Sequence, residues 1–75
     1  MKPFPFIYLT KNNSFGNPVY IGMAKPGSLA SEAVWQIKLI TYDPTSPQDI
    51  IDIQFAGESN EFNKVWNDRE SYLYG

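Results

Sequence analysis

The side chains that could carry acid–base chemistry in this 75-residue chain are its carboxylates, because the chain contains neither histidine nor cysteine. A pair of carboxylates at a fixed separation is the arrangement that hydrolyses glycosidic bonds. The candidates are Asp49, Asp52, Glu58, Glu61, Asp68 and Glu70. Acids scattered over a surface of net charge −2 are usually just solvated, and so short a chain has little room for a ligand pocket. We therefore expect no catalytic residue.

Other chemistries have still weaker candidates. The commonest zinc ligands are missing without cysteine and histidine. A calcium site at Asp49 and Asp52 would lack the dense alternating acids of a calcium loop. The glycines are too far apart to form a phosphate-binding loop, and no residue marks a lysine as the base for a serine nucleophile. The sequence predicts a non-enzymatic protein that needs no cofactor or metal.

Charge and hydropathy narrow the range of partners. A net charge of −2 and a pI near 4.8 provide no long-range attraction to phosphates or anionic lipid, so we expect neither nucleic acid nor membrane as a partner. The longest apolar region, residues 33–40, is far shorter than the roughly 20 residues that cross a bilayer, and the start of the chain does not resemble a signal peptide. We expect a soluble protein made in the cytoplasm.

The size of the chain predicts dependence on neighbours. A single domain of this length buries only about 60% of the surface that its unfolded chain exposes, which makes its stability marginal. The hydrophobic content of 43% is sufficient for a packed core, but disulfides and zinc sites are excluded as additional supports. Oligomerisation is the remaining source of stability that we expect.

Residues 1–17 are predicted to form an extended arm and a loop. Pro3 and Pro5 alternate with Phe4 and Phe6, a pattern that excludes a helix, and the asparagine- and glycine-rich stretch that follows is typical of a turn. Two placements are open. The phenylalanines can fold back on their own domain, or the arm can lie on a neighbouring subunit, as extended segments do in strand addition.

Residues 18–75 are predicted to form a small β domain. The run PVYIGMA favours a strand that ends before Pro26. A second strand begins near Val34, where alternation places Trp35 and Ile37 on one face. The prolines of DPTSPQ predict a loop of five or six residues, and DIIDIQFAG then completes an antiparallel hairpin whose more apolar face meets the core.

The C-terminal stretch FNKVWNDRESYLY is predicted to be a short helix followed by a terminal strand. Phe62, Val65, Trp66 and Arg69 follow the spacing of one helical face, with Asn60 as the cap. On this face the Arg69 guanidinium can stack on the Trp66 ring or on another ring, and can donate to a carboxylate or to backbone carbonyls. The fold class that results is mainly β: a small antiparallel sheet or partly open barrel of about four or five strands, with one short C-terminal helix.

The aromatic residues are the remaining candidates for function. Tryptophan, tyrosine and arginine are the usual anchors of protein interfaces, and the chain holds more of them than a core of this size easily encloses. The interface or structural candidates are Phe4, Phe6, Tyr20, Trp35, Trp66, Arg69, Tyr72 and Tyr74. Two hypotheses follow: contacts with protein partners, or a carbohydrate-binding module that stacks sugars on Trp35 or Trp66. The first is favoured because the domain needs external burial.

The order of motifs between Tyr20 and Tyr74 resembles a small family of uncharacterised proteins common in tailed bacteriophages. The shared pattern is Tyr-Ile-Gly, Ala-x-Pro-Gly, Trp-x-Ile, Ala-Gly and a closing Phe-x-x-x-Trp-x-x-Arg. It is occupied here by Tyr20, Ile21, Gly22, Ala24, Pro26, Gly27, Trp35, Ile37, Ala56, Gly57, Phe62, Trp66, Asp68 and Arg69. Asn67 stands where the pattern has a second acid, and no Asp separates Ala56 from Gly57, so no shared acidic site carries over.

This resemblance implies a structural protein of the virion. Its partners would be other virion proteins and copies of itself, and it would be made in the cytoplasm of the bacterial host. The resemblance does not distinguish the capsid, neck, tail or fibres, and it identifies no catalytic residue.

Overall fold

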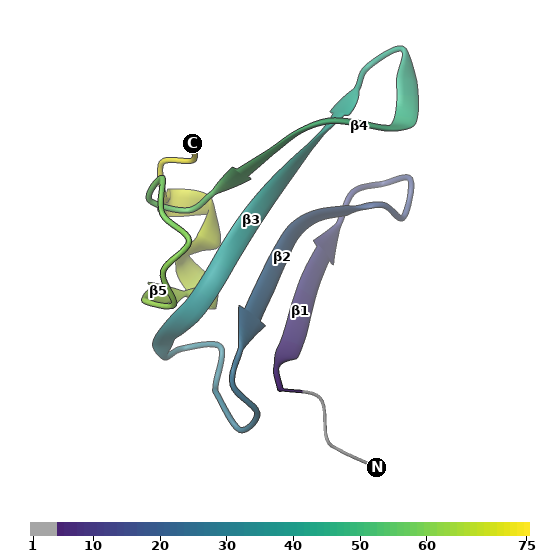
Figure 1. The fold of residues 1–75 in the computed structure, drawn as a ribbon. Coiled ribbons are helices and arrows are strands. Elements are labelled where there is room, and N and C mark those ends of the chain that lie inside the picture. The colour runs from purple at the N-terminus through teal and green to yellow at the C-terminus, as the bar shows by residue number, and fades with distance from the viewer. Residues whose placement is uncertain (1–4) are drawn as a thin grey trace.

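A single open antiparallel sheet organises the chain in the computed structural model, which describes residues 5–75 (Figure 1). The strands, in spatial order, are β1 (Ile7–Asn12), β2 (Pro18–Ala24), β3 (Ala33–Asp43) and β4 (Ser46–Phe55). A short strand β5 (Lys64–Val65) pairs with the start of β3, and the 3-10 helix η1 (Trp66–Ser71) follows it. The sheet does not close, which confirms the predicted mainly β, antiparallel class.

The first hairpin takes up most of the segment that was expected to be an arm. Residues 7–12 form β1, which pairs with β2 from Ile7 opposite Ala24 to Asn12 opposite Pro18. The turn between the strands is held by Asn13, whose side-chain oxygen accepts hydrogen bonds from the backbone of Phe15 and Asn17 at 2.9 and 3.1 Å. Residues 7–17 therefore belong to this chain's own sheet.

The second hairpin confirms the predicted antiparallel pairing of β3 with β4, with Ile40 opposite Ile53. The predicted loop of five or six residues is wrong, because β3 ends at Asp43 and β4 begins at Ser46. The Asp43 carboxylate closes this tight turn by accepting bonds from the Thr45 backbone and hydroxyl at 2.9 and 2.8 Å. Pro47 is tolerated within β4 because β4 is an edge strand.

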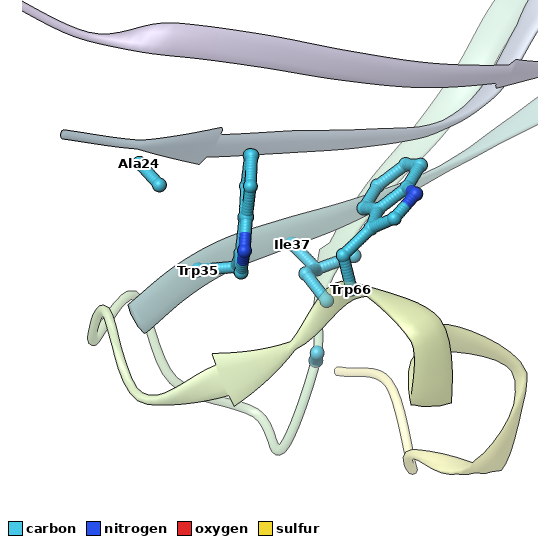
Figure 2. Close-up of a cluster of buried hydrophobic side chains, with 5 residues drawn as sticks. Ala24, Trp35, Ile37 and Trp66 are labelled. Carbon is cyan, nitrogen blue, oxygen red and sulfur yellow. The ribbon is translucent and has the colours of Figure 1, made fainter. Parts of the chain in front are cut away.

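One face of the sheet is covered by the C-terminal segment, and the core lies between them (Figure 2). The buried cluster consists of Ala24, Trp35, Ile37, Ala56 and Trp66. Gly22 faces this cluster, and a Cβ atom there would lie 2.5 Å from the Trp66 ring. The absence of a side chain at Gly22 therefore allows the indole to approach the sheet backbone directly.

The opposite face, which we call the uncovered face, has no described helix or strand packed on it. Strand register and alternation place on it Tyr8, Thr10, Ile21, Met23, Gln36, Lys38, Ile40, Ile53 and Phe55. Gln36 is buried where its side chain donates to the Asn60 carbonyl. Lys38 is the one charge in that set, and its ammonium lies 5.7 Å from the centre of the Phe55 ring. Ile40 is buried, whereas Ile53 opposite it is half exposed. The molecule is correspondingly thin, with principal extents of 38 × 32 × 18 Å.

The C-terminal helix differs from the prediction in both type and start. It is a 3-10 helix that begins at Trp66, so Phe62 and Val65 lie outside it. Val65 pairs with Ala33 in extended conformation, and this pairing prevents the helix from starting earlier. Asn60 is not a cap; its backbone carbonyl accepts a 2.8 Å hydrogen bond from the Gln36 side chain.

The predicted terminal strand is reduced to an isolated bridge between Ala56 and Tyr74. Beside it, the backbone groups of Phe55 exchange two hydrogen bonds with those of Gly75, at 2.8 and 3.1 Å. The C-terminal residues thus pair with the outer edge of the sheet where β4 ends.

Candidate interaction surfaces

Six of the residues proposed from sequence meet on the covered face, in what we call the aromatic–arginine cluster. Its members are Tyr20, Trp35, Trp66, Arg69, Tyr72 and Tyr74. The two indole rings are 6.2 Å apart with a 46° tilt, and the rings of Tyr20 and Tyr74 are 5.9 Å apart with a 55° tilt. Tilted pairs at these distances are the favourable geometry for aromatic rings. The cluster joins β2 and β3 to η1 and the residues after it.

Arg69 is the charged member of the cluster and lies between two rings. Its guanidinium carbon is 4.8 Å from the centre of the Trp66 ring and 6.0 Å from that of Tyr20, which confirms the predicted stacking on Trp66. One terminal nitrogen donates to the Trp66 carbonyl at 3.2 Å, while the buried Nε has no hydrogen-bond partner in the described part of the chain. The Arg69 side chain thus contacts Trp66 and Tyr20 of its own chain.

Tyr72 and Tyr74 connect parts of the cluster through hydrogen bonds of their hydroxyl groups. The Tyr72 hydroxyl accepts from the Val65 backbone at 2.8 Å, and the Tyr74 hydroxyl donates to the Arg69 carbonyl at 2.5 Å. Burial, followed by repulsion from the Tyr20 and Tyr72 phenols, raises the pKa of Tyr74 to about 12, and the Arg69 charge opposes this rise. The neutral phenol is the form that this packing favours.

The indole rings of Trp35 and Trp66 are both buried in the core. Trp35 is 0% exposed and Trp66 is 7% exposed, and the Trp35 ring nitrogen donates to the Leu29 carbonyl at 2.9 Å. Neither indole face is open to a sugar ring. The carbohydrate-binding hypothesis depended on Trp35 or Trp66 as a stacking platform, and both rings are buried.

Phe6 lies apart from this cluster and helps to form what we call the apolar pocket. Its ring stacks on that of Phe62 at 5.6 Å, with 13° between the planes. The pocket has a volume of about 420 Å³ and is lined by Phe6, Lys25, Ser28, Val34 and Phe62. Because Phe6 precedes Tyr8 by two residues and Lys25 follows Met23 by two, strand alternation places the pocket at one end of the uncovered face. Phe4 lies outside the described residues.

Three exposed isoleucines of β4 are apolar residues of the sheet that sequence analysis did not select. This isoleucine ridge consists of Ile50, Ile51 and Ile53, which are 52%, 59% and 50% exposed. Thr41 pairs with Asp52 and Tyr42 with Ile50, so Ile51 is the extra residue of a bulge. The sequence contained a signal for this exposure: two consecutive isoleucines lie between Asp49 and Asp52, and a fully buried strand would not carry those acids.

Among residues 5–75, no group of three or more acids, histidines or cysteines gathers where it could hold a metal ion. Hydrogen bonds from Thr45 lower the pKa of Asp43, a carboxyl that serves the hairpin turn. Nor does the described chain contain a helix with the length and apolar character to span a membrane.

Comparison of the chain with protein-family models, with curated proteins and with solved structures found no match.

Proposed function

We propose that this chain is a non-enzymatic structural component of a tailed-phage particle that acts through contacts with other proteins, copies of itself included. The observation that carries the proposal is the isoleucine ridge: three large aliphatic side chains, each at least half exposed, on an edge strand. Exposed apolar edge strands are a liability for a free protein, and they mark surfaces that a partner covers.

Three further features support contacts rather than chemistry. The sheet has an uncovered apolar face, and a domain of this size gains stability when a neighbour buries such a face. The aromatic–arginine cluster is occupied with internal packing. The motif resemblance between Tyr20 and Tyr74 supports the assignment to a phage particle that assembles in the bacterial host.

Quantitative mass spectrometry of purified particles tests this proposal. In a phage that encodes this chain, we expect the protein to sediment with intact virions in many copies, whereas a replication protein of the same phage, as control, stays in the soluble fraction. Its absence from washed particles would overturn the assignment. So would a folded monomer that binds no virion protein in size-exclusion chromatography with light scattering.

A further inference from the structure

We propose that the isoleucine ridge of one copy of this chain docks into the apolar pocket of another copy. The inference rests on the proposed function and deepens it, because it names a second copy as the partner and assigns a surface to each side of the contact. The observations that carry it are the positions of ridge and pocket, the chemistry of their residues and the charges beside them.

Ridge and pocket lie at opposite ends of the sheet. Ile50 pairs with Tyr42 near the end of β3, while the pocket residue Val34 lies at the start of β3. The eight residue steps from Val34 to Tyr42 span roughly 26 Å at about 3.3 Å per step. A chain therefore cannot fill its pocket with its own ridge, but a second copy can.

The two surfaces are complementary in shape and polarity. The pocket is a hollow of about 420 Å³ with apolar walls from Phe6, Val34 and Phe62, and the ridge is a projection of branched aliphatic side chains. The volume of the pocket falls within the range of roughly 300–1,000 Å³ that is typical of ligand-binding sites. Inserting Ile50 and Ile51 into it would remove apolar surface of both copies from water.

The charges near the two surfaces are also complementary. Lys25 is the one charged residue in the pocket lining, and it is exposed. Asp49 precedes the ridge and Asp52 lies between Ile51 and Ile53, and both are exposed. Docking a ridge in a pocket therefore brings acids of one copy near a lysine of the next, which is a favourable pairing of charges.

The position of Lys38 favours a head-to-tail arrangement. A two-fold pair would exchange two ridge–pocket contacts at once, and its axis would pass near the midpoint between Val34 and Tyr42 on β3. Lys38 stands at that midpoint on the uncovered face, so the pair would press two lysines together. A head-to-tail contact avoids this, and such contacts build rings or filaments.

A mixing experiment tests the contact. We expect the wild-type protein to form assemblies larger than a pair, with a mass that rises with concentration in light scattering. Ile51→Glu disables the ridge and Lys25→Glu disables the pocket, so each variant alone should associate at least tenfold more weakly. An equimolar mixture should recover a one-to-one complex, because one intact ridge meets one intact pocket. Leu73→Glu, at an exposed leucine outside both surfaces, is the matched control and should assemble as the wild type does.

A monomer at every concentration would overturn the inference, and so would assemblies that Ile51→Glu leaves intact. A photoreactive phenylalanine analogue at Phe62 identifies the occupant directly. Crosslinks to β4 of another copy support the proposal, whereas crosslinks to residues 1–4 would assign the pocket to the N-terminus and overturn it. A closed pair would overturn the head-to-tail arrangement. A wild-type protein that stays monomeric and is nevertheless incorporated into virions would refute this inference and leave the proposed function standing.

Discussion

The Trp66 indole packs directly on the backbone of Gly22, so closely that a Cβ atom at residue 22 would lie 2.5 and 2.8 Å from two carbons of the ring. The contact joins the middle of β2 to the first residue of η1. A short C-terminal segment thereby covers a sheet whose core contains few large side chains.

The glycine contact predicts that Gly22→Ala destabilises the protein. The added methyl group collides with a ring that the core holds in place, and overpacking of this kind costs about 1–3 kcal/mol. Urea denaturation followed by tryptophan fluorescence measures the loss. Gly75→Ala is the control, because its Cβ would meet only the flexible Glu58 side chain. Equal stability of Gly22→Ala and the wild type would contradict the packing.

Removing the indole itself should be more damaging. Trp66→Ala leaves a cavity beside Trp35 and Ile37, and such truncations cost about 3–5 kcal/mol, enough to unfold a marginal domain. Thermal denaturation by circular dichroism is the measurement, with Leu73→Ala at an exposed position as control. A melting temperature within a degree or two of the wild-type value would show that Trp66 is not part of the core.

Arg69→Lys should destabilise the protein although it preserves the charge. Lysine lacks the planar group that stacks between the rings of Trp66 and Tyr20, and it presents a single ammonium to the Trp66 carbonyl. We expect a loss of about 1 kcal/mol in urea denaturation. Lys64→Arg, which makes the reverse change outside the cluster, should be close to neutral. If both variants match the wild type, the stacking contributes nothing measurable.

Alkaline pH should weaken the fold through Tyr74. Because its pKa rises from 10.0 to about 12 on folding, the unfolded chain loses this proton first as the pH increases. The contribution is complete below pH 10 and is lost as the pH rises toward 12. Tyr74→Phe should reduce the slope of stability against pH in that window, measured by urea denaturation at a series of pH values.

The same substitution removes the hydrogen bond to the Arg69 carbonyl, so Tyr74→Phe should also be less stable by about 1 kcal/mol at neutral pH. Tyr8→Phe, at an exposed tyrosine, controls for the loss of a phenol. An unchanged alkaline slope in Tyr74→Phe would refute this account of the pH dependence.

Local patterns were sufficient to predict much of the sheet. The β-branched run ending at Ala24 and the alternation around Trp35 correspond to β2 and β3, because alternating side chains must meet a core on one face. The spacing of Trp66 and Arg69 also predicted their contact correctly, since residues three apart share a face in a 3-10 helix as they do in an α-helix.

Other features depend on tertiary pairing that a single segment does not reveal. Val65 has helical spacing relative to Trp66, yet its pairing with Ala33 draws it into an extended strand. Pro47 signals a loop unless one knows that β4 lies at the edge of the sheet. The exposure of Ile50 and Ile51 depends on whether another layer covers the sheet, and no local pattern contains that information.

The backbone pairing of Gly75 with Phe55 occupies one end of the free edge of β4. Strand-by-strand stacking, as in amyloid, requires a continuous row of free amides and carbonyls along an edge. The amide and carbonyl of Phe55 are already hydrogen-bonded to Gly75. An added strand can therefore form backbone hydrogen bonds with β4 only up to Phe55. Gly75 thus blocks strand addition at the Phe55 end of β4. The part of the β4 edge that can still pair with another strand is the part that bears the isoleucines.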